Sequence, residues 1–209
     1  MALKSKSQRQ FFSRGYQPLN IDISYRCPLE CPQCGRQRHF RNNGQKVPGK
    51  DLSLENFEKI AKHFKLISFC GQYSDPVHHP RFIDFLDVCK KQNVYTEVST
   101  ASSFKSKDWF VTAFKTYPKA RWIFGIDGMP EQSHHYRKNQ NGKKLFEIMC
   151  EAKKHLVHKP IWQFIIFSFN ENHIDDAIQL AGKNLLEFKI INSARWDNPN
   201  DPLKPSIRR

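Results

Sequence analysis

The chain has 209 residues and a formal net charge of +14, and 39% of its residues are hydrophobic. This length suits one domain, or a small α/β barrel, with a substantial buried core. The positive charge favours an anionic partner: a nucleic acid, a nucleotide cofactor or an acidic peptide. Charge alone does not choose among these partners. Part of it lies at the two ends of the chain, where solvated tails explain it as well as a dedicated anion surface does.

The six cysteines do not form a disulfide pattern. Three are crowded into a triplet and three are single, and no apolar signal segment opens the chain, so a reducing environment fits better. No run of 18 apolar residues is present, so we expect no membrane span. The sequence therefore predicts a cytoplasmic protein with free thiols.

Apolar periodicity predicts the secondary structure. After a basic N-terminal arm at residues 1–18, the predicted strands cover residues 19–25, 66–70, 94–101, 120–127, 161–169 and 186–191. The predicted helices cover residues 53–65, 82–89, 107–116, 145–156 and 174–185. Residues 35–50 are rich in Arg, Asn and Gly, which predicts a long surface loop.

Strands and helices alternate about six times between residues 19 and 195, which predicts an α/β core domain with parallel strands and right-handed crossovers. Residues 196–209 form a basic tail with three prolines. We expect this tail to wrap the surface or to act as a lid.

Three thiols, Cys27, Cys31 and Cys34, follow the first predicted strand. Three thiolates are one ligand short of a closed tetrahedral site, so the triplet suits a metal centre with one open position. An alternative is a structural zinc site, in which His39 would be the fourth ligand. That alternative makes the chain a basic nucleic-acid-binding module without catalysis.

Further polar residues fall at the carboxyl ends of the predicted strands. In a parallel α/β barrel these ends open on one face, so their side chains form one site. Besides the cysteines, the candidates are Gly71, Gln72, Asp75, Ser99, Thr100, Asp127, Asn170, Glu171 and Arg195.

The spacing C-x3-C-x2-C resembles the signature of the radical S-adenosylmethionine (radical SAM) superfamily. Residues 71–76 are similar to its Gly-Gly-Glu-Pro segment, although the second glycine is replaced and the carboxylate is Asp75. Residues 98–102 resemble its Ser-Thr-Asn-Gly segment. Residues 126–128 with Tyr136-Arg137, and residues 169–173, resemble motifs of its peptide-modifying branch.

The resemblance implies a partial (β/α)6 TIM-like barrel in which Cys27, Cys31 and Cys34 hold an oxygen-sensitive 4Fe-4S cluster. SAM would bind the open iron of the cluster, and reductive cleavage would give a 5'-deoxyadenosyl radical that removes a hydrogen atom from a substrate. The resemblance implies cofactor contacts by Gly71, Gln72, Asp75, Ser99, Thr100, Asp127 and Asn170. We expect Arg137, Glu171 and Arg195 to contact the substrate.

The family pattern is not matched everywhere. Gln33 stands where an aromatic residue usually precedes the third cysteine, and the domain with extra clusters of many peptide-modifying members is not expected. The motif similarities favour a peptide or protein as the substrate, whereas the positive charge favours a nucleotide or RNA. An electron donor such as flavodoxin or ferredoxin is the expected protein partner.

Overall fold

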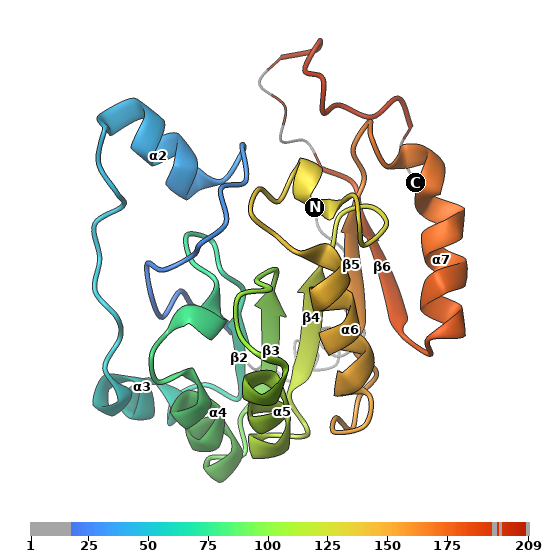
Figure 1. The fold of residues 1–209 in the computed structure, drawn as a ribbon. Helices are drawn as coiled ribbons and strands as arrows, with labels where there is room; N and C mark the ends of the chain where they lie inside the picture. Colours follow the sequence, from blue (N-terminus) through green and yellow to red (C-terminus); the bar gives the residue numbers. More distant parts are fainter. Residues whose placement is uncertain (1–17, 194–195, 197, 208–209) are drawn as a thin grey trace.

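The computed structural model describes residues 18–193, 196 and 198–207. Six parallel strands form one sheet in the order β1 to β6 (Figure 1). The predicted α/β fold with a parallel partial barrel is therefore confirmed. The strands are β1 (Pro18–Asn20), β2 (Leu66–Phe69), β3 (Tyr95–Thr100), β4 (Arg121–Gly125), β5 (Ile161–Ile165) and β6 (Glu187–Ile191).

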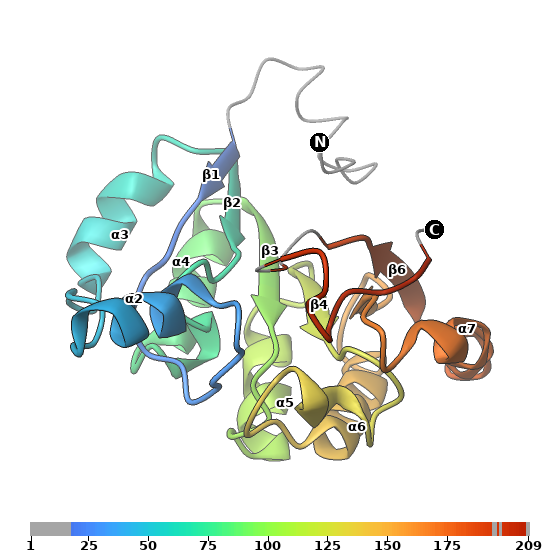
Figure 2. The ribbon, with the colours of Figure 1, turned by 90° about the horizontal axis from the view of Figure 1, so that it is seen from above.

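Helices connect successive strands, and Figure 2 shows α3 to α7 around the outside of the curved sheet. The helices are α2 (Gly35–Asn43), α3 (Leu54–Ala61), α4 (Phe82–Lys91), α5 (Lys107–Thr116), α6 (Gly142–Ala152) and α7 (Ile174–Lys183). Three short 3-10 helices are η1 (Pro76–His78), η2 (Ser133–His135) and η3 (Glu171–His173). The Ser53 side chain caps α3 by accepting a hydrogen bond from the Asn56 N–H (3.2 Å).

Aromatic side chains fill the space between the sheet and these helices. Phe57 of α3 stacks on Phe85 of α4 with 4.3 Å between ring centroids. Trp122 of β4 is fully buried and packs edge-on against Phe114 of α5 at 4.9 Å. Large rings bury much apolar area per residue, so a chain with modest hydrophobic content still forms a closed core.

Two sequence predictions about the start of the chain are wrong. The predicted loop at 35–50 contains the helix α2, which has no buried residue and therefore no apolar stripe to reveal it. The first predicted strand runs to residue 25, but only Pro18–Asn20 pair with β2. The Ile21 N–H still donates to the Ser68 carbonyl of β2 (3.0 Å), and the Asp22 side chain then binds a loop beyond β2, as described below.

Residues 198–207 cross the loop that follows β5. The Ser168 N–H donates to the Leu203 carbonyl (3.2 Å), and Leu203 packs against a small cluster formed by Tyr136, Ile165 and Phe167. This part of the predicted tail thus packs on the barrel. Among the described residues, no helix has the length and apolar character needed to cross a membrane.

Candidate functional site

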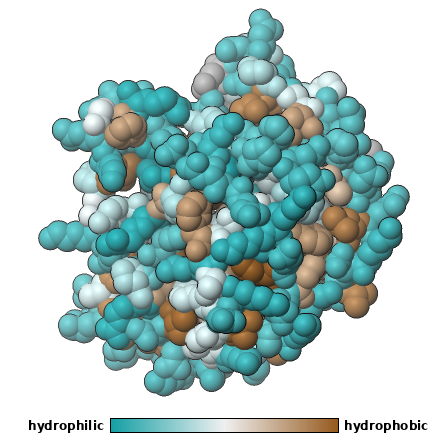
Figure 3. Space-filling model, in the orientation of Figure 1, coloured by the Kyte–Doolittle hydropathy of each residue, from teal (hydrophilic) through white to brown (hydrophobic). Residues whose placement is uncertain are grey.

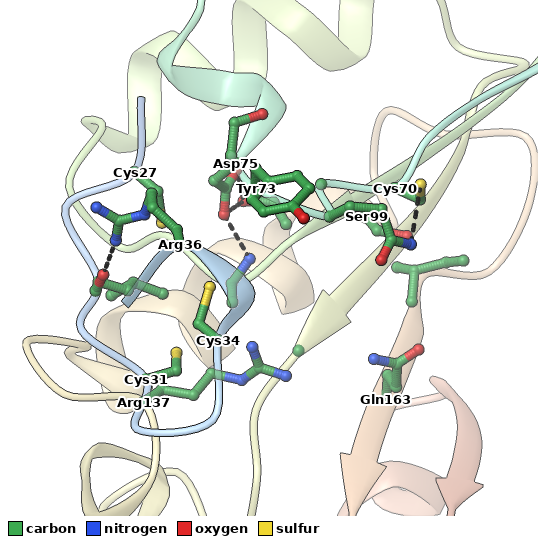
Figure 4. Close-up of a pocket in the computed structure, with 18 of the residues that line it drawn as sticks. Cys27, Cys31, Cys34, Arg36, Cys70, Tyr73, Asp75, Ser99, Arg137 and Gln163 are labelled. Carbon is green, nitrogen blue, oxygen red and sulfur yellow. Dashed lines mark hydrogen bonds between the residues drawn. The ribbon is translucent and has the colours of Figure 1, made fainter. Parts of the chain in front are cut away.

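One cavity at the carboxyl ends of the strands has about 780 Å³ of empty space, its open mouth included. Nine of the predicted site residues line it: Cys27, Cys31, Cys34, Gly71, Gln72, Asp75, Ser99, Thr100 and Arg137. In Figure 4, the three cysteines and Arg137 lie on one side, with Ser99 and Gln163 on the other.

The three motif cysteines lie on the loop between β1 and α2, and the loop is closed by a hydrogen bond from the Cys34 N–H to the Cys31 carbonyl (3.0 Å). Burial raises the pKa of Cys27 to about 12 and also raises the pKa of Cys31. Burial thus favours the thiol form of both side chains, and a bound metal would displace their protons.

The cavity lining includes the three motif cysteines but not His39. In the described part of the chain, no group of three or more His, Cys, Asp or Glu side chains is arranged to hold a metal ion. His39, the fourth ligand of the zinc alternative, lies on α2 with its Nδ1 3.3 Å from Asn43 Nδ2, and it does not line the cavity. Three thiols facing one cavity are the ligands that a cluster with an open iron requires.

The loop after β2 is held in shape by Gly71 and Asp22. Gly71 has φ +59°, and a Cβ on it would lie 2.2 Å from the Ser74 carbonyl oxygen, so only glycine fits. The Asp22 carboxylate accepts hydrogen bonds from the N–H groups of Gln72 (2.9 Å) and Ser74 (3.1 Å). Sequence analysis missed Asp22, because its partners lie about 50 residues further along the chain.

Asp75 joins the end of β3 to this loop. Its carboxylate accepts hydrogen bonds from Thr100 Oγ1 (2.9 Å) and from the Ala101 N–H (2.8 Å). Burial raises the pKa of Asp75, and these donors oppose that shift. Because both oxygens already accept hydrogen bonds within the chain, the carboxylate fixes the ends of two strands, and its contact with the SAM amine stays a prediction.

Arg137 and Asp127 form a buried ion pair with 2.8 Å between Arg137 Nε and Asp127 Oδ2. Burial disfavours the charged guanidinium, but the Asp127 charge outweighs this and raises the pKa of Arg137. Asp127 itself is fully buried and does not line the cavity. Its other carboxylate oxygen, Oδ1, accepts a hydrogen bond from the Ile165 N–H (2.9 Å). Asp127 thus contacts Arg137, which lines the cavity, and its predicted contact with the cofactor stays a prediction.

Two further predicted residues do not reach the cavity. The Asn170 amide closes the turn after β5 by donating to the Ile165 carbonyl (2.9 Å) and accepting from the Phe167 N–H (2.8 Å). The Glu171 carboxylate accepts hydrogen bonds from the N–H (2.6 Å) and hydroxyl (3.0 Å) of Ser206. Arg195 lies outside the described residues.

The cavity also contains residues that the sequence analysis did not select. Arg36 donates a hydrogen bond to the Leu29 carbonyl, and Gln163 points inward from β5. Cys70 also lines the cavity, and its Sγ lies 3.7 Å from Gln72 Nε2. Cys34 directly precedes α2, so a helix prediction there would have drawn attention to Arg36 in its first turn.

No family model matches the chain. The fold is nevertheless shared with solved structures. SuiB from Streptococcus suis superposes with a TM-score of 0.70 at 13% identity, over 97% of this chain and 46% of SuiB. Its S-adenosylmethionine complex gives 0.70 at 15% identity, over 97% and 47% of the two chains. Methylornithine synthase (PylB) gives 0.61 at 14% identity, over 99% and 65%.

These identities are low, so the likeness establishes the shared fold. SuiB has also been solved with its precursor peptide SuiA, and that structure superposes with a TM-score of 0.67 at 14% identity, over 90% of this chain and 42% of that one. The chain spans less than half of SuiB and about two thirds of methylornithine synthase.

Proposed function

We propose that this chain is a radical SAM enzyme. The observation that carries the proposal is that the C-x3-C-x2-C cysteines, the Gly71 loop and Ser99-Thr100 come from three strand ends and line one cavity. These segments were selected from the sequence by their similarity to cofactor-binding segments of that family. The shared fold with SuiB, which has been solved with S-adenosylmethionine, supports the proposal.

Cys27, Cys31 and Cys34 would hold a 4Fe-4S cluster. When bound, the cluster supplies the electron that cleaves SAM into methionine and a 5'-deoxyadenosyl radical, which removes a hydrogen atom from a substrate. The Gly71 loop would bind the amino group of SAM, and Ser99 or Thr100 its ribose. The Arg36 and Arg137 guanidiniums bring positive charge to this cavity, which suits a carboxylate and an anionic cluster.

A peptide or protein is the substrate class that we favour. SuiB, which shares this fold, has been solved with a precursor peptide. The net charge of +14 supports a nucleotide or RNA as the second candidate. The two candidates differ in their response to salt, because binding through phosphates weakens steeply as the salt concentration rises.

Anaerobic reconstitution with iron and sulfide tests the cluster. The wild-type protein should be brown and bind about four irons, as a 4Fe-4S cluster requires. Cys31→Ala should lose the colour and most of the iron. Cys70→Ala is the matched control, because Cys70 lines the same cavity outside the triplet and should leave the iron content unchanged. Stoichiometric zinc in protein purified without oxygen, with no iron-dependent colour, would favour the zinc-binding module instead.

A further inference from the structure

The segment from Cys31 to Lys50 carries positive charge without any acidic residue. It contains five Lys and Arg residues and no Asp or Glu. Arg38, Arg41, Lys46 and Lys50 are exposed, and within the described part of the chain no acidic side chain forms an ion pair with any of them. We call residues 35–50, which comprise α2 and the loop after it, the basic segment.

The helix of the basic segment does not serve the core. None of its residues is buried, and Phe40 leaves 49% of its surface exposed. Figure 1 shows α2 beyond the carboxyl ends of the strands, and Figure 3 shows this projection as mostly hydrophilic with a small apolar patch. A helix without a buried face gains little from intrachain packing, so its sequence is free to serve a partner.

A small pocket provides an apolar centre for such a contact. Tyr25, Phe40 and Val47 line it together with Lys46, and Glu30 is the acidic residue of this lining. Gln37 lines it too, and Arg41 lies one helical turn after Gln37 on the same side of α2. Aromatic side chains at the centre and charges at the rim are typical of protein interfaces.

The basic segment also adjoins the proposed cluster ligands. Cys34 is the residue that caps the start of α2, and α2 is nine residues long, or about 13 Å at a rise of 1.5 Å per residue. Cys27 lines the central cavity and also an outer pocket that contains Lys46 and Arg26. A molecule seated on the basic segment therefore comes close to the cysteine loop from outside, while the central cavity stays free for SAM and substrate.

From this geometry we propose that the basic segment is the docking surface for a small acidic electron-transfer protein. The inference rests on the proposed function, because a cluster needs a source of electrons. In each transfer the donor loses one electron and the site gains one, and no bond forms or breaks at the docking surface. Complementary charge guides and orients such an encounter, and its strength falls as salt is added.

A charge-reversal variant, Arg41→Glu with Lys46→Glu, tests the docking surface. Binding of flavodoxin to the reconstituted full chain is measured by calorimetry at low and high salt. We expect the variant to bind flavodoxin about tenfold or more weakly at low salt. Lys115→Glu with Lys119→Glu is the control, because both residues are exposed on and after α5 and their reversal changes the net charge equally. The proposal would be overturned if both double variants weakened flavodoxin binding equally, or if neither variant weakened it.

Electron delivery is tested separately from the radical chemistry. Reduced flavodoxin and dithionite are compared as reductants for SAM cleavage. The variant should lose about tenfold in rate with flavodoxin and keep the wild-type rate with dithionite, since a small reductant needs no docking surface. An equal loss with both reductants would contradict the docking role.

Two other outcomes identify where the account fails. If wild-type protein cleaves no SAM with dithionite, the proposed function is wrong, and the calorimetric comparison alone then decides whether flavodoxin docks here. If an RNA oligonucleotide binds through Arg41 and Lys46 and flavodoxin does not bind, the basic segment is a nucleic-acid surface and the docking proposal is overturned.

Discussion

The Arg137 guanidinium lies across Gly125 at the end of β4. A Cβ on Gly125 would meet Arg137 Nη2 at 2.9 Å, so the missing side chain makes room for the cation. Asp127, two residues further on, fixes the other edge of the guanidinium through the contact at Nε. Gly125 and the buried Asp127 carboxylate thus position the Arg137 guanidinium, which lines the cavity.

Breaking this ion pair should destabilise the fold. Asp127→Asn leaves the buried Arg137 charge without its carboxylate, which costs about 3–5 kcal/mol. Urea unfolding measures the change. Glu187→Gln removes the partner of Arg121 at the edge of the sheet, where the carboxylate is 49% exposed, and should cost less than about 1 kcal/mol. Equal losses in the two variants would show that the Asp127 pair is no stronger than a surface pair.

Alanine substitutions at two glycines with positive φ distinguish the cost of backbone strain from the cost of steric overlap. Gly44→Ala (φ +64°) has open space around its Cβ and should cost roughly 1–2 kcal/mol through strain alone. Gly71→Ala (φ +59°) adds the overlap with the Ser74 carbonyl and should cost more, by roughly another 1–3 kcal/mol. It should also weaken SAM binding, which Gly44→Ala should not. Calorimetry with SAM detects this difference, and equal affinity in both variants would argue against a role for the Gly71 loop.

Glu151 makes part of the stability depend on pH. Its hydrogen bonds with Lys107 and then Lys154 lower its pKa from an ordinary value of 4.5 to about 2. The unfolded chain therefore takes up this proton first as the pH falls, and the stabilisation is lost between about pH 4.5 and pH 2. Glu151→Gln should lower the Tm at pH 7, and the gap to wild type should close across that interval. A gap that stays constant would contradict this assignment.

Glu171 holds the segment at 198–207 rather than lining the cavity. Glu171→Ala removes the acceptor for the Ser206 N–H and hydroxyl, and should make this segment more sensitive to brief proteolysis. Glu131→Ala provides a control, because Glu131 is exposed in the loop before η2. Mass spectrometry locates the cleavage sites. Identical cleavage in both variants would mean that other contacts, such as that of Ser168 with Leu203, suffice.

Sequence periodicity predicted the elements that bury a face. Phe82, Phe85 and Cys89 fall on one stripe, and all three are buried in α4. The same reasoning failed for α2, whose residues face solvent and carry no stripe. The predicted strands at 120–127 and 161–169 are also too long, since β4 ends at Gly125 and β5 at Ile165. The apolar pattern continues past each strand because the turns that follow are buried as well.

Site positions were predictable where the chemistry lies within a local motif. Cys31 and Gly71 reach the cavity as expected, since each belongs to a short segment at a strand end. Asp127 and Asn170 are also at strand ends, but their side chains turn to backbone groups that only the folded chain brings near. Asp22 was not predicted as a site residue, although its carboxylate binds the loop at Gln72, which is distant in the sequence.

Formation of 5'-deoxyadenosine tests the central claim most directly. The reconstituted protein is incubated with SAM and dithionite without oxygen, and the nucleoside is measured by liquid chromatography with mass detection. We predict that wild type and Cys70→Ala release 5'-deoxyadenosine and that Cys27→Ala, Cys31→Ala and Cys34→Ala do not. Release by the triplet variants, or no release by a wild-type protein that carries its full complement of iron, would contradict the account.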